Sequence, residues 1–421
     1  MLLVPACTAQ DTVAGDEQTI RMLVEQVKEL QHRDRDLQER IKTLEATRAS
    51  TELPATEPAL RTTSPAMPEQ TMAVETAAPP SFNVRDLRGI QWRGFGEVNY
   101  KVLNQRQPEL GTGGFVPGSA GNFYTGDFDL FLTAKVSDKT NVLSEIAFGE
   151  GDHQTFNVSL ERFLLQYEFN DHLKMSFGRY QTGIGYYNTE FRSASWALST
   201  ADRPLVMESA SEGGLLPTQA IGIAITGLVP SGKLGLNYLF EYGSSDTVRP
   251  DINGSGSVDD ENNGNHVLVG LFVRPERLRG LRIGASFYHD KIDNSRDAVP
   301  IRYGQTIVNG HVVYVAHRVE FLSEGFLIRH SSERNSAVFN TPAFYVQISK
   351  QLGHIRPFLR CQYVNADKAS IFDDVRLRYG PSFGARYDFN ENIAFKAQLD
   401  HTVRENMPDL NGLQMQTAFT F

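Results

Sequence analysis

The sequence predicts an all-β protein, a transmembrane antiparallel β-barrel of about sixteen strands preceded by an α-helical coiled coil and a disordered linker. Three observations predict it. Short segments of alternating apolar and polar residues recur from residue 88 to the end of the chain, and the connections between them are in turn tight and long. The chain also ends in GLQMQTAFTF, an alternating strand whose last residue, Phe421, suits the closing strand of a ring.

Composition narrows the class of protein. The 421 residues are 40% hydrophobic, and no stretch approaches the roughly 18 consecutive apolar residues that a membrane helix requires. A helical membrane protein is therefore excluded, whereas a barrel is not, because barrel strands keep one polar face. The net charge of −9 argues against nucleic acid as a partner. Two cysteines, Cys7 and Cys361, provide neither a disulfide framework nor metal-binding spacing.

The first 87 residues divide into three parts. Residues 1–16 read as the remnant of a targeting segment, in which lipidation of Cys7 is the less favoured interpretation because Pro5 fits a lipoprotein cleavage box poorly. Residues 17–46 predict a coiled-coil helix, with a lone amphipathic helix as the alternative. Its seam consists of Ile20, Leu23, Val27, Leu30, Leu37, Ile41 and Leu44. Branched residues at position a with Leu at position d favour two strands. Residues 47–87, rich in Pro, Ala and Thr, predict a linker.

Residues 88–421 predict the barrel. The expected strands start near Ile90, Phe128, Val142, Phe156, Leu173, Ile221, Leu234, Val267, Leu281, Val308, Val319, Phe344, Ile355, Leu377, Ile393 and Leu413. An even number of antiparallel strands, with tight turns on one side and long loops on the other, is typical of an outer-membrane barrel, whereas a sandwich has loops clustered at both ends. The interior of so wide a barrel holds water.

The connections follow this two-sided pattern. Tight turns are expected at 137–140, 170–172, 230–233, 275–280, 316–318, 352–354 and 390–392. Longer connections are expected at 105–121, 183–216, 246–264, 291–304, 331–340, 366–375 and 403–411, with a short exception near 150–153. Two strands, in SLERFLLQYEF and HRVEFLSEGFLIRH, alternate too poorly for their faces to be assigned.

Several stretches resemble a known family. They are LERFLLQYEFNDHLKMSFGRYQTGIGYYN at 160–188, TQAIGIAITGLVPSGKLGLNYLFEYG, and the terminal TAFTF. With a coiled coil ahead of the barrel, they resemble trimeric outer-membrane porins, in particular the family that includes the phosphate-selective porins O and P. The resemblance implies a homotrimer in outer-membrane lipid, a periplasmic coiled coil, passive diffusion of small hydrophilic solutes, and reading of Phe421 by the barrel-assembly machinery. The lysine-rich phosphate path of that family is not evident in this chain.

A charged constriction is the predicted site. In the porins that the chain resembles, the loop corresponding to 183–216 folds inward; here it supplies Glu190, Arg192, Asp202, Arg203, Glu208 and Glu212. Strand parity points Arg356, Arg360, Arg376, Arg378 and Arg386 inward. An acidic loop facing arginines would create an electric field across the channel, and clustered arginines favour the passage of anions. The alternative is that Arg–Glu pairs only hold the wall together, because inward acids such as Asp129, Glu145 and Asp400 are plentiful.

The loop 246–264 contains a candidate calcium-binding sequence. Oxygen donors with the spacing of an EF-hand loop are Asp251, Asn253, Ser255, Ser257 and Asp259. Asn262 stands where the bidentate Glu is required, so a solvated loop is favoured over a calcium site. Walker A, HExxH and GxSxG motifs are absent, so an enzyme is not predicted. The alternatives are a soluble or surface all-β carbohydrate-binding protein and an outer-membrane barrel hydrolase.

Overall fold

The computed structural model describes residues 90–105, 117–150, 156–191, 195–208, 214–245, 265–294, 301–372, 375–405 and 407–421. The predicted targeting remnant 1–16, the coiled coil 17–46, the linker 47–87 and the calcium loop with Asp251 and Asp259 lie outside the described residues. Among the residues that are described, no helix is both long and apolar enough to cross a membrane.

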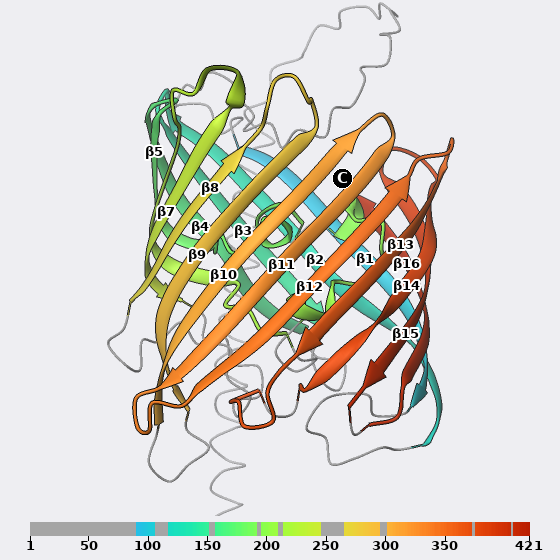
Figure 1. Cartoon of the computed structure of the whole chain (residues 1–421). Helices are drawn as coiled ribbons and strands as arrows, with labels where there is room; N and C mark the ends of the chain where they lie inside the picture. The colour runs from blue at the N-terminus through green and yellow to red at the C-terminus, as the bar shows by residue number, and fades with distance from the viewer. Residues whose placement is uncertain are drawn as a thin grey trace, which may run out of the picture. The chain divides into compact units, whose positions relative to one another are not determined.

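The described residues form sixteen strands that close into a barrel (Figure 1). In chain order they are β1 Ile90–Gln105, β2 Pro117–Ser137, β3 Thr140–Glu150, β4 Phe156–Asn170, β5 Leu173–Gln181, β6 Gln219–Leu228, β7 Leu236–Ser245, β8 His266–Val273, β9 Leu281–Asn294, β10 Ile301–Ala316, β11 Val319–Ser332, β12 Val338–Lys350, β13 Ile355–Asn365, β14 Leu377–Asp388, β15 Ile393–Arg404 and β16 Leu410–Thr420. Each strand pairs with its chain neighbours in antiparallel fashion, and β1 pairs with β16. The predicted antiparallel barrel and its number of strands are confirmed.

The last residue completes the ring. The Phe421 N–H donates to the carbonyl of Gly94 at 3.1 Å, and the Gly94 N–H donates to a backbone oxygen of Phe421 at 3.0 Å. The Phe421 ring occupies the space beside Gly94, where an added Cβ would stand 2.2 Å from it. It also stacks on Phe128 of β2, with the two ring centroids 5.9 Å apart. The terminal aromatic therefore covers a glycine on the outer face of the seam between the first and last strands.

Side chains alternate between the outer and inner faces. On β12, for example, Phe344, Val346 and Ile348 are exposed on the outer face, while Tyr345 and Gln347 are buried on the inner face. An apolar outer face and a mixed polar inner face follow directly from the two-residue period of a strand.

The two strands that lacked clear faces have separate explanations. In β4 the register shifts between the pairs Glu145–Arg162 and Ile146–Leu160, so Glu161 is an extra residue in a β-bulge. Outward residues therefore change parity from Leu160 to Phe163. In β11 the alternation of buried residues is regular, but the inner face includes Leu322, Phe326 and Ile328 as well as acids. Because apolar residues occur on both faces of β11, its two-residue period cannot be recognised in the sequence.

The connections are sorted by side, with some corrections to their lengths. β2 begins at Pro117 rather than near Phe128, and β10 begins at Ile301 rather than near Val308. The expected long connections 291–304 and 331–340 shorten to 295–300 and 333–337. These strand ends are polar or glycine-rich, and they are extended by backbone pairing with β1, β9 and β11 rather than by an amphipathic pattern.

Candidate functional site

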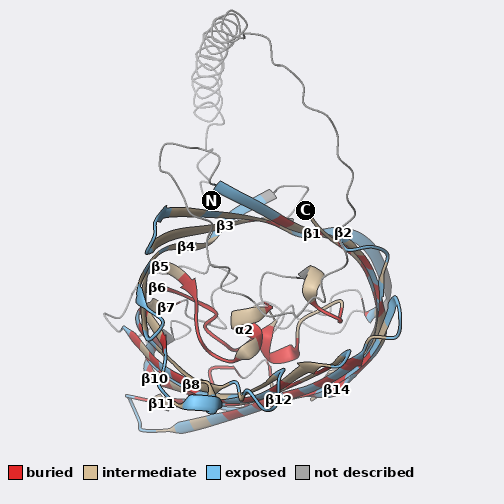
Figure 2. Cartoon of the chain, turned by 90° about the horizontal axis from the view of Figure 1, so that it is seen from above, coloured by how far each residue is buried: buried red, intermediate tan, exposed pale blue. Residues whose placement is uncertain are grey.

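The connection between β5 and β6, residues 182–218, contains the short helix α2 (Tyr186–Glu190) and the 3₁₀ turns η3 (Ser195–Ala197) and η4 (Leu205–Met207). Figure 2 shows α2 inside the ring of strands, on the side of β8 to β12. Tyr187 and Phe191 belong to one buried apolar cluster with Leu322 and Phe326 of β11. This packing explains why β11 is apolar on its inner face.

A carboxylate of β11 caps the N-terminus of α2. Glu324 accepts hydrogen bonds from the backbone N–H groups of Tyr186 at 2.6 Å and Tyr187 at 2.8 Å. The Tyr345 hydroxyl donates to the same carboxylate at 2.5 Å. Gly185, the N-cap residue, has φ of +81°, and an added Cβ would stand 2.4 Å from Glu324. The helix is therefore fixed by a buried acid and by a glycine in the left-handed region.

A row of three cations crosses the inner wall on β13 to β15. Arg356 pairs in register with Arg386, and Arg386 with Lys396. Like charges directly opposite one another are unfavourable by themselves. Carbonyl oxygens of alternate residues in the connection offset this repulsion: those of Trp196 and Leu198 accept from Arg386, and that of Thr200 accepts from Lys396 at 3.0 Å.

Acids near the row contribute as well. Asp388 accepts from Arg386 at 2.6 Å, and Glu320 lies 3.8 Å from Arg356. The Arg386 guanidinium also lies over the Trp196 ring, 4.9 Å from its centroid. The wall and the connection are therefore joined by charge-assisted hydrogen bonds along residues 196–200.

Asp202 of the connection is hydrogen-bonded to several side chains of the inner wall. Arg360, fully buried on β13, donates to its backbone carbonyl at 3.0 Å and to its carboxylate. Gln398 donates to one carboxylate oxygen at 2.6 Å, and Gln414 to the other at 2.8 Å. Burial alone would raise the pKa of Asp202, but the charge of Arg360 and the hydrogen bonds from Gln398 and Arg360 outweigh it, so the pKa lies below its usual 3.8.

Most of the predicted site residues lie in this region. Arg360 pairs with Asp202, and Arg378 with Glu208 at 3.5 Å. Glu190 accepts from Arg282 of β9 at 2.6 Å, an arginine that sequence analysis did not select. Arg376 precedes β14 and has φ of +51°, so strand parity does not apply to it. Arg192 and Glu212 lie outside the described residues.

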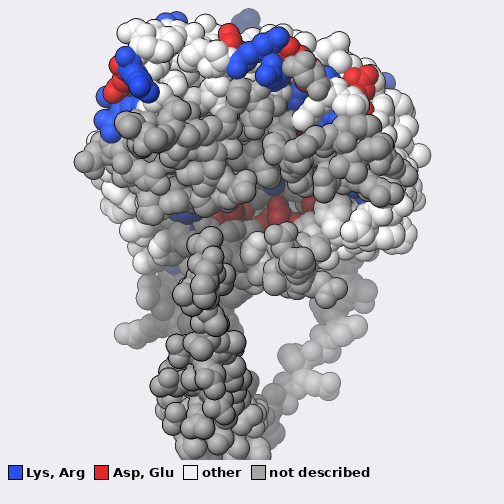
Figure 3. Space-filling view, turned by 90° about the horizontal axis from the view of Figure 1, so that it is seen from below, with Lys and Arg blue, Asp and Glu red and all other residues white. Residues whose placement is uncertain are grey.

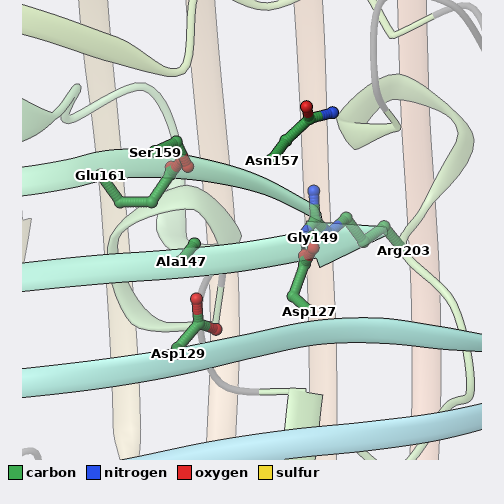
Figure 4. A pocket seen from close by; sticks show the side chains of 8 residues that line it. All are labelled: Asp127, Asp129, Ala147, Gly149, Asn157, Ser159, Glu161 and Arg203. Carbon is green, nitrogen blue, oxygen red and sulfur yellow. Dashed lines mark hydrogen bonds and ion pairs between the residues drawn. The ribbon is translucent and has the colours of Figure 1, made fainter. Parts of the chain in front are cut away.

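The opposite wall is acidic. A cavity of about 140 Å³ is lined by Asp127 and Asp129 of β2, Ala147 and Gly149 of β3, Asn157, Ser159 and Glu161 of β4, and Arg203 (Figure 4). Arg203 reaches across from the connection to Asp127, with Nη2 3.4 Å from Oδ2. Figure 3 shows acidic side chains within the hollow of the face seen from below.

Sequence reasoning missed several of these residues. The alternation of β15 places Lys396 and Gln398 on the inward face, but they were not selected as site residues. Glu324 lies on the strand without assignable faces, and Asp127 and Glu161 lie at bulges, where parity fails. In β2 the bulge sets Gly126 and Asp127 against Glu97, and Gly126 lets Glu97 and Asn99 approach closely.

Comparison with known proteins shows a likeness of fold. The outer membrane channel DcaP of Acinetobacter baumannii is 10% identical with a TM-score of 0.55, covering 81% of this chain and 99% of that one. OmpF of Salmonella typhi, in a complex with daunomycin, is 12% identical with a TM-score of 0.52, covering 79% and 97%. In-vitro folded OmpT of Vibrio cholerae, in its trimer form, is 11% identical with a TM-score of 0.50, covering 79% and 100%. No protein-family model and no curated protein matches the chain.

Proposed function

We propose that the protein is an outer-membrane porin through which small hydrophilic solutes or ions diffuse passively. The observation that carries the proposal is a closed barrel of sixteen described strands, apolar on its outer face and polar or charged over much of its inner face. A barrel of this size does not fill its interior with its own strand side chains, so a water path is expected. The likeness of fold to DcaP and OmpF, an outer membrane channel and an outer-membrane protein, supports the same reading.

In the proposed channel the connection 183–216 folds inward and narrows the path. Support comes from its hydrogen bonds to inward-facing side chains on β11, β13, β14, β15 and β16, including Glu324, Arg360 and Gln414. Because most of these anchors lie on β11 to β16, and Arg203 reaches across the interior to Asp127, solutes would pass on the side of β2, β3 and β4. The arginines thus act as positioning residues that hold the constriction.

The sign of ion selectivity follows from which charges face the water path. The anion preference predicted from the sequence requires the charges of Arg360, Arg378 and Arg386 to act on the path. Each of the three is buried and paired with the connection or with a neighbouring acid. Anion preference stays a prediction from the sequence, and the cation preference argued in the next subsection is its alternative; a reversal potential measured in a salt gradient distinguishes the two.

We also propose a homotrimer in outer-membrane lipid, with the predicted coiled coil 17–46 in the periplasm and Phe421 as the residue read by the assembly machinery. The trimer form of OmpT supports the assembly, whereas the seam residues favour two strands. Native mass spectrometry of the full chain and of a chain lacking 17–46 tests it. A mass of three 47.0 kDa chains is expected for the full protein, and a dimer would contradict the proposal.

Single-channel recording in a planar bilayer tests the function directly. Folded protein is first verified by its heat-modifiable migration on a gel, which distinguishes a closed barrel from its unfolded chain. Stepwise conductance, in groups of three if the trimer is correct, is the expected result. Absence of conductance from protein that has passed the folding check would overturn the porin proposal.

A further inference from the structure

The cavity on β2, β3 and β4 has an unbalanced set of charges. Its described lining holds the carboxylates of Asp127, Asp129 and Glu161 and a single cation, Arg203. Asp127 is paired with Arg203. Glu161 accepts hydrogen bonds from Ser159, at 2.7 Å, and from Gln219. Both of these carboxylates therefore have a donor.

Asp129 is the exception. Its residue is only 6% exposed, yet its carboxylate makes no hydrogen bond or ion pair with any described residue. The neighbouring carboxylate Glu145 is engaged by Arg162 through one oxygen only, and its other oxygen is buried without a hydrogen-bond partner. Burying a carboxylate without a donor is unfavourable, and a positively charged group in the cavity would remove that penalty.

The space for such a group is built into the strands. Asp129 pairs in register with Ala147, and Ala147 with Ser159, so one row across β2, β3 and β4 has a methyl group between an acid and a hydroxyl. Gly149 lies beside Asp127, where an added Cβ would stand 3.3 Å from Oδ1. Small residues at these two positions form the floor of the cavity (Figure 4).

We propose that the cationic group of a permeating solute, an ammonium or guanidinium, binds to Asp129 between Asp127 and Glu161, and that this wall makes the channel prefer cations. The inference rests on the proposed porin function. Arg203 already places a guanidinium against Asp127, which shows that the wall accepts this chemistry. An organic cation is favoured over a metal ion, because the three carboxylates, like the other His, Cys, Asp and Glu side chains of the described residues, form no group placed to hold a metal ion.

The test is the zero-current potential in a KCl gradient, with 1,4-diaminobutane added as a probe that competes with K⁺. Wild-type protein should give a potential of the cation-selective sign, and the diamine should reduce the K⁺ current. Asp129→Asn should lower the K⁺ to Cl⁻ permeability ratio by about twofold, the size expected for one charge acting through a partly aqueous path. It should also weaken block by the diamine.

Two further variants make the test specific. Ala147→Met fills the cavity without changing charge, so it should weaken block by the diamine about as strongly as Asp129→Asn. Asp138→Asn removes the same charge from a tight turn, where the Asp138 side chain is 91% exposed and forms a solvent-screened ion pair with Lys135, so it should leave block by the diamine unchanged and should change the permeability ratio less than Asp129→Asn does.

The outcomes separate the inference from the proposed function. An anion-selective potential, or variants of Asp129 and Ala147 that behave like Asp138→Asn, would overturn the cation site while leaving the porin intact. Asp127→Asn provides a second charge variant if Asp129→Asn fails to show heat-modifiable migration. Absence of any conductance from folded wild-type protein would instead overturn the porin proposal, and the cation site with it.

Discussion

At the scale of single residues, the pair formed by Asp202 and Arg360 fixes the connection between β5 and β6 to the inner face of β13. Asp202→Asn leaves a fully buried guanidinium without its counter-charge. Removing one partner of a buried ion pair is strongly destabilising. The Asp202 side chain is 26% exposed, so solvent screens part of this effect. We therefore expect the attachment of residues 195–208 to the wall to be weakened by about 2 kcal/mol. Single-channel recordings should show a larger and noisier conductance.

A double variant provides the control for this pair. Asp202→Asn combined with Arg360→Met removes both charges, so the unpaired cation disappears. The noise should then fall below that of Asp202→Asn alone. Equal noise in the single and double variants would show that the charge of Arg360 does not hold the connection.

The same carboxylate predicts a dependence on pH. The pKa of Asp202 is lowered in the folded protein, so its contribution to stability is present above the ordinary value near 3.8 and is lost as the pH falls through the lower folded value. The charged groups that face it include Arg360, Lys101, Lys396 and Asp400. Conductance should be constant from pH 7 to about 5 and should become larger and noisier below about 4. Asp202→Asn should lack this acid transition; a transition of wild-type size in that variant would assign it to another group.

At the scale of elements, α2 depends on the backbone of Gly185. Gly185→Ala places a Cβ at φ of +81° and 2.4 Å from Glu324, so the carboxylate or the helix must move. We expect a cost of about 1–2 kcal/mol for docking of α2 and a change in conductance without loss of the barrel. Gly310→Ala is the matched control, because no atom lies within 4 Å of its added Cβ. Identical recordings from the two variants would contradict the role of Gly185.

The existence of the strands was predictable from the sequence, whereas their contacts with the connection between β5 and β6 were not. β12 and β15 were predicted correctly because outward-facing and inward-facing residues differ in polarity at every second position. The faces of β11 could not be assigned from the sequence because its inward residues Leu322 and Phe326 pack against another part of the chain rather than facing water. Strand parity correctly placed the arginines of β13 and β14 on the inner face. Their pairing with Asp202, with Glu208 and with the carbonyls of 196–200 depends on tertiary structure, which a local sequence pattern does not encode.

At the scale of the whole molecule, the ring closes through residues from opposite ends of the described chain. β1 and β16 pair from Phe95 with Thr420 to Leu103 with Gly412. Contacts between such distant residues carry the largest loop-closure cost, so we expect this seam to form last during folding. Phe421 adds two backbone hydrogen bonds and covers Gly94 at the end of the seam.

Replacement of the last side chain should therefore weaken closure. Phe421→Ala removes the stacking on Phe128 and uncovers Gly94, with an expected cost of about 1 kcal/mol and a lower temperature for the change in gel migration. Deletion of Phe421 also removes both backbone hydrogen bonds and should lower that temperature further. Phe389→Ala is the matched control, because Phe389 is 59% exposed, like Phe421 at 60%, but lies away from the seam in the turn between β14 and β15. Equal shifts for Phe421→Ala and Phe389→Ala would mean that the terminal ring has no special part in closing the barrel.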